Sequence, residues 1–309
     1  MTTGKQKRPG PEPESHSPQS PKPGDRRPAC VGELAVVATP IGNMGDLSPR
    51  AVATLKEADV VCCEDTRHTG QMLARLGLHA SRLLSVHAHN EPKRLAEVLE
   101  LLERGAHVAL VSDAGTPALS DPGELVISAA IAAGHKVTTV PGPSAAVSAL
   151  VVAGLGTARW RFEGFLPRKG PDRARRLGEI AAASHPSVIY EAPQRVGATL
   201  HDLAECCGGD REVAVCRELT KRFEETWRGT LAEACERASA APARGEHVIV
   251  VAGAPAGKRS SPNEGEVRNA VASRMSAGAS RRQAAAAVAV ELDVPKRFAY
   301  ETSLDRGDR

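Results

Sequence analysis

The chain has 309 residues, of which 41% are hydrophobic and 25% are charged. This composition excludes a disordered or fibrous protein and provides for roughly two globular domains. The longest apolar stretches, such as residues 151–155 and 248–252, are far shorter than the ~20 residues of a membrane-spanning helix, so we expect no membrane association. The formal net charge of +3, from 40 basic and 37 acidic residues, identifies no partner.

The first 30 residues contain many prolines and hardly any apolar side chains, which predicts a disordered tail. From Glu33 onward, short β-branched runs alternate with longer helical patterns, as in βαβ units built around a mainly parallel sheet. In chain order we expect strands at 34–38, 59–63, 83–86, 108–111 and 137–140. The helices expected between them are 49–57, 70–76, 92–104 and 122–133.

A second set of strands is expected at 187–190, 213–217 and 248–251. The fold class is therefore α/β in two halves, 31–150 and 151–253. Residues 254–264 are typical of a linker, and three short helical patterns follow at 265–275, 280–291 and 295–304. The last 45 residues, 265–309, are thus expected to form a small helix-turn-helix-like module.

The seven cysteines are an odd number and include no C-x-x-C pair, which indicates a reducing, cytoplasmic location. The adjacent pairs at 62–63 and 206–207 are poorly spaced to chelate a metal ion. His87 and His89 lie two residues apart and form a second candidate metal pair, but the sequence offers no third ligand. We therefore predict no metal site.

Three glycine- and proline-rich turns, at 39–43, 112–117 and 141–146, each follow an expected strand directly. Loops at the carboxyl ends of parallel strands converge on one crevice, where ligands bind. Glycine permits close approach to the backbone, and the amides at the next helix N-terminus suit a carboxylate or phosphate. The alternative is that the turns are only structural. The sequence contains neither G-x-G-x-x-G nor a phosphate loop, which disfavours a dinucleotide or ATP as the ligand.

Residues 33–65 resemble the opening of the tetrapyrrole-methylase-like fold, also called class III methyltransferases, whose members bind S-adenosylmethionine between two α/β halves. The run DAGTPALSDPG at 113–123 is similar to the signature of the ribosomal RNA small subunit methyltransferase I family. Further matches are EDTR at 64–67, HAHNE at 87–91, PGPSA at 141–145, GFLP at 164–167, YEAP at 190–193 and ELTK at 218–221. Gln194 departs from this pattern, because a histidine is expected there.

The resemblance implies 2′-O-methylation of a cytidine ribose in the decoding region of 16S rRNA, within the small ribosomal subunit, by a homodimer that uses S-adenosylmethionine. The implied cofactor-binding residues belong to the three turns and to the YEAP motif: Pro40, Gly42, Asn43, Asp113, Ala114, Gly115, Thr116, Ser144, Ala145 and Tyr190. For Asp113 an equally good interpretation is that its side chain only caps the turn that leads to Gly115.

Methyl transfer to a ribose hydroxyl needs alignment of the reacting groups, exclusion of water and a proton acceptor. The catalytic candidates are the carboxylates Asp46, Glu64, Asp65 and Glu191, with His87, His89 and Glu218 as further possibilities.

Residues 159–176 combine seven basic side chains with three aromatic ones, a pattern suited to phosphates and splayed bases. The alternative is a solvated helix start with its rings in the core. The predicted RNA-binding residues come from this segment, from ELTK and from the C-terminal helices: Arg168, Lys169, Arg173, Arg176, Lys221, Arg281 and Arg282.

Two other functions stay open from the sequence. One is a methylase of a porphyrin-like macrocycle that uses the same cofactor, although such an enzyme needs neither the basic segment nor the C-terminal helices. The other is an RNA-binding or assembly factor without catalytic activity, in which the glycine turns bind nothing.

Overall fold

The computed structural model describes residues 32–241, 243–255, 264–292 and 294–304. The expected tail at 1–30 and most of the expected linker at 254–264 lie outside these residues. The chain divides into two compact units between Ser144 and Ala145. Two α/β units and a group of C-terminal helices confirm the expected fold class. In the described part, no helix is both long and apolar enough to cross a membrane.

The first unit contains a five-stranded parallel sheet in the order β3-β2-β4-β1-β5. Its elements are β1 (Glu33–Val37), η1 (Met44–Asp46), α1 (Pro49–Glu57), β2 (Val60–Cys63), α2 (Thr66–Arg75), β3 (Leu83–Ser85), α3 (Glu91–Glu103), β4 (His107–Leu110), α4 (Glu124–Ala132) and β5 (Lys136–Val140).

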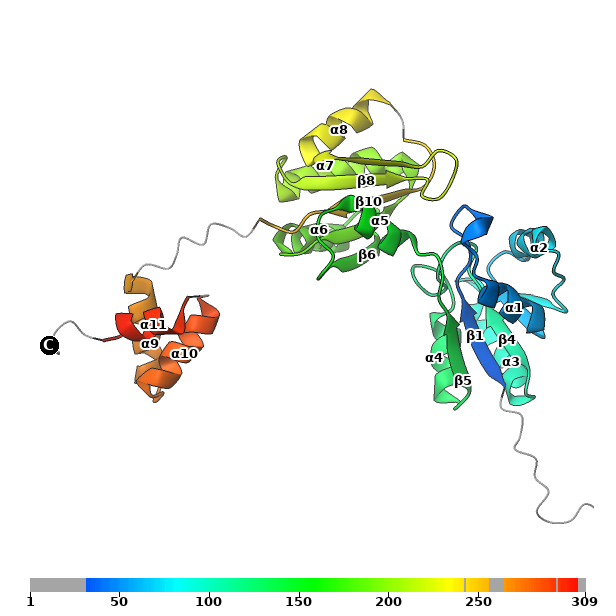
Figure 1. Ribbon diagram of the computed structural model, residues 1–309, viewed down its shortest axis with the longest axis horizontal. Helices are drawn as coiled ribbons and strands as arrows, with labels where there is room; N and C mark the ends of the chain where they lie inside the picture. Colours follow the sequence, from blue (N-terminus) through cyan, green and yellow to red (C-terminus); the bar gives the residue numbers. More distant parts are fainter. Residues whose placement is uncertain (1–31, 242, 256–263, 293, 305–309) are drawn as a thin grey trace, which may run out of the picture. The chain divides into compact units, whose positions relative to one another are not determined.

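Helices cover both faces of the first sheet (Figure 1). Leu55 of α1 and Leu73 of α2 are buried against one face, and Val98 of α3 and Val126 of α4 against the other. The inner strands β1, β2 and β4 therefore have two buried faces, which explains their continuous apolar runs. Helix α2 begins four residues earlier than expected because the Asp65 carboxylate accepts a hydrogen bond from the Arg67 N–H and caps the helix.

The second unit contains a five-stranded sheet in the order β6-β7-β10-β8-β9. Its elements are α5 (Ala145–Ala153), β6 (Arg161–Phe165), α6 (Pro171–Ala182), β7 (Ser187–Glu191), η2 (Pro193–Arg195), α7 (Val196–Cys207), β8 (Glu212–Arg217), β9 (Glu225–Thr230), α8 (Leu231–Ala240) and β10 (His247–Val251).

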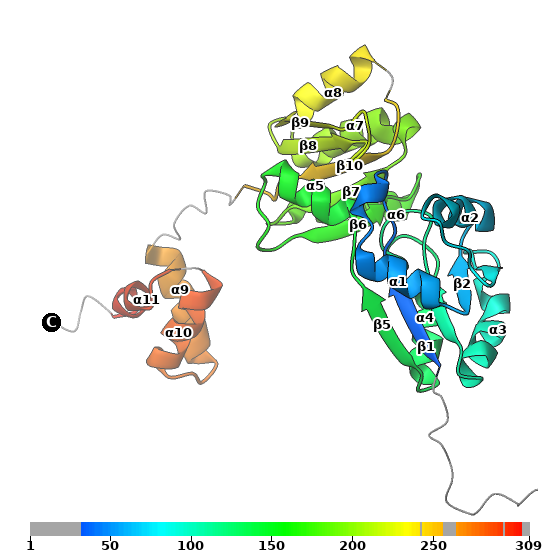
Figure 2. The ribbon, with the colours of Figure 1, turned by 45° about the vertical axis from the view of Figure 1, so that its right-hand side comes forward.

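The expectation of a mainly parallel sheet is wrong for the second unit, in which only β6 and β7 pair in parallel. Strands β8 and β9 follow each other along the chain and pair antiparallel, with no crossover helix between them. Helices α6, α7 and α8 pack on one face of this sheet and α5 packs on the other (Figure 2). Strands β6 and β9 were not expected, because their sequences, RFEGF and ETWRGT, lack a regular apolar alternation.

The C-terminal helices are α9 (Glu264–Ser276), α10 (Arg281–Glu291) and α11 (Lys296–Thr302). They share a small core that includes Val267, Val271, Val288 and Ala299. Ser280 forms a capping box with Gln283 at the start of α10. Pro295 is the N-cap of α11.

Candidate cofactor and RNA sites

Two of the three glycine-rich turns are joined by a pair of backbone hydrogen bonds. The Thr39 N–H donates to the Gly115 carbonyl at 2.8 Å, and the Gly115 N–H donates to the Thr39 carbonyl at 3.1 Å. The Thr39 hydroxyl also donates to the carbonyl of Ser112 at 3.0 Å. Strands β1 and β4 are neighbours in the sheet, so the turns that leave their carboxyl ends lie side by side.

The third turn is attached to the same group. The Thr116 hydroxyl donates to the Pro143 carbonyl at 3.2 Å. At Gly142, a Cβ atom would lie 3.0 Å from the Cβ of Ala38, so this glycine permits close packing of the β5 turn on the β1 turn. The three turns expected to converge therefore do lie together within the first unit.

Gly115 occupies a conformation and a space that other residues do not tolerate. Its φ of +83° lies in the left-handed region, and a Cβ atom would lie 3.3 Å from Cγ2 of Ile41 and 3.8 Å from the Pro143 carbonyl oxygen. In the turn after β5, Ser144 Oγ is shielded from solvent and has no hydrogen-bond partner among the described residues. Since buried hydroxyls are normally satisfied, this atom fits a site built to receive a polar ligand.

Four carboxylates gather beside these turns. The Asp65 N–H donates to Oδ1 of Asp113 at 3.2 Å, which ties the end of β2 to the end of β4. Burial, and then the neighbouring charge of Asp113, raise the pKa of Glu64. Burial and the charge of Glu64 raise the pKa of Asp121 to about 6. Asp121 belongs to the 113–123 motif but is not among the catalytic residues predicted from the sequence. No sequence pattern distinguishes it from an ordinary aspartate in a turn.

The other catalytic candidates differ in position. Asp65 caps α2, and its hydrogen bonds with the Arg67 side chain and backbone lower its pKa. Asp46 is exposed at the end of η1. His87 and His89 lie with their ring centroids 6.1 Å apart, but the only metal-suited cluster among the described residues involves neither of them.

Glu191 is engaged by several groups within the fold. It lies in the second unit, is 2% exposed, and accepts hydrogen bonds from the Thr199 hydroxyl at 2.6 Å and from the Ala192 N–H at 2.9 Å. Arg195 also pairs with it at 3.4 Å. Because both carboxylate oxygens are engaged, Glu191 holds β7 and α7 together. Glu218 is likewise engaged, because the Glu246 N–H and Lys221 bind its carboxylate and lower its pKa.

The remaining cofactor candidates are placed as follows. Asn43 caps η1 through the Gly45 N–H, while Pro40 and Gly42 lie in the same turn. Ala114 is exposed beside Gly115. In the second unit, Tyr190 accepts a hydrogen bond from the Ala146 N–H at 3.1 Å, next to Ala145 at the start of α5.

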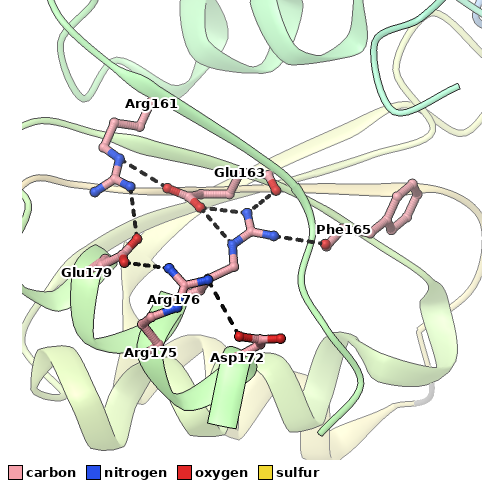
Figure 3. Close-up of polar contacts among 7 residues, drawn as sticks. All are labelled: Arg161, Glu163, Phe165, Asp172, Arg175, Arg176 and Glu179. Atoms are coloured by element: carbon pink, nitrogen blue, oxygen red, sulfur yellow. Dashed lines mark hydrogen bonds and ion pairs between the residues drawn. The ribbon is translucent and has the colours of Figure 1, made fainter. Parts of the chain in front are cut away.

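Half of the basic segment is used inside the protein. The Arg176 guanidinium binds the carboxylate of Glu163, a side chain only 4% exposed, and Arg161 pairs with the same carboxylate at 3.2 Å (Figure 3). Arg175 pairs with Glu179 at 2.7 Å. A buried carboxylate is tolerable only when it is paired in this way. These pairs are structural.

Arg173 is also a structural residue. It is 8% exposed, and its guanidinium binds Asp202 at 2.5 Å, the Thr199 hydroxyl at 3.1 Å and the Pro167 carbonyl at 2.9 Å. Arg173 and Arg176, both predicted to contact RNA, are thus engaged by carboxylates of the fold. The sequence does not reveal these partners, because Asp202 lies outside the segment and Glu163 is buried by packing.

Arg168 and Lys169 differ from these arginines. Both are exposed in the turn before α6, and neither has a partner in the part of the chain that the structure describes. Phe165, in the strand just before them, exposes 52% of its surface. Lys221 pairs with Glu218 at 2.9 Å and with Glu246 at 3.0 Å. Arg282 is exposed on α10, next to Arg281, whose Nε is buried without a partner.

The raised pKa of Asp121 predicts how the stability of the protein depends on pH. Its value of about 6 in the folded chain exceeds 3.8, so the folded state holds this proton more tightly than the unfolded state. The free energy of unfolding should therefore fall between about pH 4 and pH 6, as the buried carboxylate ionises. Asp121→Asn should remove this loss and stabilise the protein by about 1 kcal/mol at pH 7, since the residue is only partly buried.

Urea denaturation of both proteins between pH 4 and pH 7 measures the effect. Asp46→Asn, which removes an exposed carboxylate, is the matched control and should follow the parent. Parallel stability curves for the parent and Asp121→Asn would show that Asp121 ionises freely in the folded state.

The family model for tetrapyrrole (corrin/porphyrin) methylases matches residues 33–235. The chain is 42% identical, over 89% of its length and 98% of the relative, to a ribosomal RNA small subunit methyltransferase I from Synechocystis sp.. It is 49% identical to the Xylella fastidiosa protein of that name, over 72% of this chain and 82% of the relative.

Solved structures support the fold. The methyltransferase CobJ superimposes with a TM-score of 0.56 at 22% identity, over 72% of this chain and 95% of the other. A uroporphyrin-III C-methyltransferase from Thermus thermophilus, solved with S-adenosylhomocysteine, gives a TM-score of 0.51 at 19% identity, over 71% and 96%. Since the fold and the sequence matches agree over both α/β units, the chain belongs to the ribosomal RNA small subunit methyltransferase I family of the tetrapyrrole methylase fold.

Proposed function

We propose that this chain transfers a methyl group from S-adenosylmethionine to the 2′-oxygen of a cytidine ribose in the decoding region of 16S rRNA. The observation that carries the proposal is the group of three joined turns around Gly115, together with relatives named for small-subunit rRNA methylation at 42–49% identity. A macrocycle substrate has weaker support, since the uroporphyrin-III C-methyltransferase from Thermus thermophilus is only 19% identical to this chain.

Residues of the first unit fit the cofactor. Gly115 carries no side chain that would stand between its backbone and a ligand, and Ser144 Oγ and the Asp113 carboxylate are the proposed polar contacts. S-adenosylmethionine, when bound, supplies an electrophilic methyl group on a sulfonium. The contribution of the protein is to orient the two reactants, exclude water and accept one proton.

Glu64 and Asp121 are the proposed proton acceptors. Each is more basic than an ordinary carboxylate. Burial and the charge of Asp113 raise the pKa of Glu64, and burial and the charge of Glu64 raise the pKa of Asp121 to about 6. A general base whose pKa approaches the working pH is the most effective. Asp65, whose pKa is lowered, is proposed to position α2 instead.

The proposed RNA contacts are the cations that the fold does not use. Arg168, Lys169 and Arg282 are exposed and have no acidic partner among the described residues. Arg281 and Lys221 stay in the proposal as secondary contacts, since Lys221 already binds two carboxylates. An RNA substrate also implies the cytoplasm as the working compartment.

We further propose a homodimer. Helix α4 exposes the apolar side chains of Leu125 and Ile131, and helix α5 exposes Val147 and Val151. Each of these helices therefore leaves two large apolar side chains in water, which is typical of a surface that is covered by another subunit.

The cofactor site is tested by Gly115→Val. The new side chain meets Ile41 and needs an unfavourable φ, so the affinity for S-adenosylmethionine should fall about tenfold or more, which corresponds to about 1.4 kcal/mol. Calorimetry measures the affinity, and methyl transfer to small-subunit RNA should fall with it. Gly134→Val, also at positive φ but with open space around it, is the matched control for backbone strain. Equal affinities in both variants and the parent would refute the site.

RNA docking is tested by the double variant Arg168→Ala/Lys169→Ala. Log affinity falls as log salt concentration rises, and each phosphate neutralised on a single strand contributes about −0.7 to this slope. If both side chains touch phosphate, the slope of the double variant should be shallower than the parent's by about one to two units. Affinity for S-adenosylmethionine should not change. Arg175→Ala, an arginine already paired with Glu179, should leave the slope as it is. If the double variant has the same slope as the parent, the turn is a solvated surface that does not contact RNA.

The dimer is tested by light scattering at micromolar concentration, where the parent should have twice the mass of one chain. Val151→Glu buries a charge in the proposed interface and should yield monomers. Val290→Glu, at the most exposed large apolar residue of the described part, should stay dimeric. A parent that scatters as a single chain contradicts the proposal.

A further inference from the structure

A cavity of about 340 Å³ lies in the second unit, on the face of the sheet covered by α7 and α8. Its wall is formed by the end of β8, the starts of β9 and β10, the start of α7 and the end of α8. This volume is at the lower end of the ~300–1,000 Å³ typical of small-molecule sites. None of its lining residues belongs to the three glycine-rich turns or to the predicted RNA-binding set, so nothing described above uses it.

The inner wall of the cavity is apolar and contains one large ring. Val196, Leu200 and Val215 line it, together with the indole of Trp227. Trp227 leans along β9 over Gly229, where a Cβ atom would lie 2.7 Å from the indole ring. The absence of a side chain at Gly229 thus leaves the space that the indole occupies. An aromatic wall in a partly open cavity is suited to a flat ligand.

The rim of the cavity is positive. Arg217 and Arg237 both pair with Glu225, the former at 3.8 Å. One carboxylate between two guanidiniums leaves an excess positive charge. Arg244 adds another, since it is exposed and its guanidinium has no acidic partner among the described residues. Arg217 Nε donates to the Arg244 carbonyl at 2.8 Å and so holds that part of the rim in place.

Two hydrogen-bond acceptors complete the site. Burial lowers the pKa of His247, which keeps the imidazole neutral. Its Nδ1 lies 3.0 Å from the Gly245 carbonyl, so Nδ1 carries the hydrogen and Nε2 is an acceptor. The Glu225 carboxylate is the other acceptor. The cavity therefore offers an aromatic wall, acceptors for amino groups and cations for an anion.

From this combination we propose that the cavity binds one nucleotide of the RNA substrate, with the base beside Trp227 and the phosphate at Arg244. The inference that this nucleotide is part of an RNA rests on the proposed function. The suitability of the cavity for a nucleotide does not, because it follows from the lining residues alone. Arginine and aromatic side chains together are the usual means of holding an unstacked nucleotide. Such a contact would fix the register of the RNA through the second unit, independently of Arg168 and Lys169.

The test compares Arg244→Glu with the matched charge reversal Lys56→Glu. Lys56 is exposed near the end of α1, whose last turn is at the opposite edge of the first sheet from the glycine-rich turns. Binding of a small-subunit RNA fragment is measured by fluorescence anisotropy, and calorimetry with S-adenosylmethionine shows whether each variant is intact. Each nucleoside 5′-monophosphate is titrated separately in excess S-adenosylhomocysteine, which occupies the proposed cofactor site.

We expect Arg244→Glu to weaken RNA and nucleotide binding about tenfold, as for the loss of one charged contact, and to reduce the salt slope by about 0.7. Lys56→Glu should bind both like the parent. Nucleotide should quench tryptophan fluorescence in the parent, and Trp227→Phe should lose the quenching that arises from that ring while still binding nucleotide in calorimetry.

Unchanged RNA affinity and salt slope in Arg244→Glu would overturn the proposal. Loss of nucleotide binding with unchanged RNA binding would also overturn it, since the ligand would then be a free nucleotide. If RNA binding depends on Arg244 but no methyl group is transferred by the parent, the proposed function is wrong and the nucleotide site stands.

Discussion

The pair of hydrogen bonds between Thr39 and Gly115 is the constraint on which the first unit's site depends. It closes the carboxyl edge of the sheet by tying the turn after β1 to the turn after β4. Only glycine combines the required positive φ with the available space beside Ile41. Because Thr116 then reaches the Pro143 carbonyl, all three turns are held as one rigid surface. A rigid surface lets the backbone itself serve as the ligand's contact.

Charge pairing separates structural from functional groups in this chain. Arg173 and Arg176 look like RNA ligands in the sequence, yet each has a carboxylate partner and little exposure. Arg168 and Lys169 are exposed and have no carboxylate partner among the described residues, so they are available to an external anion. The same reasoning applies to acids. Glu191 is satisfied by neighbours, whereas burial and nearby carboxylates raise the pKa values of Glu64 and Asp121. Groups that the fold leaves uncompensated are the best candidates for function.

The sequence was most informative where local rules decide the structure. All five strands of the first sheet were predicted to within one residue at each end. The three inner strands, β2, β4 and β1, are almost entirely buried, and so their sequences are continuous apolar runs. Strand β9 was missed because an edge strand with one exposed face needs no apolar run. The convergence of the glycine turns was predicted from their position after strands, a rule of topology rather than of contacts.

The partners of individual side chains could not be predicted from the sequence. Nothing in residues 159–176 indicates that Asp202, on α7, neutralises Arg173, since the pair is brought together by packing of α6 on α7. For the same reason the cavity beside Trp227 could not be predicted, because its walls come from five elements spread over fifty residues. Asp121 was overlooked since only its burial beside Glu64 distinguishes it from other turn residues.

The most direct test of the central claim is a map of ribose 2′-O-methylation in the 16S rRNA of cells that lack this protein. The account predicts that one cytidine in the decoding region loses its methyl group, and that the parent gene restores it whereas the Gly115→Val gene does not. Identical maps in the presence and absence of the protein would contradict the account.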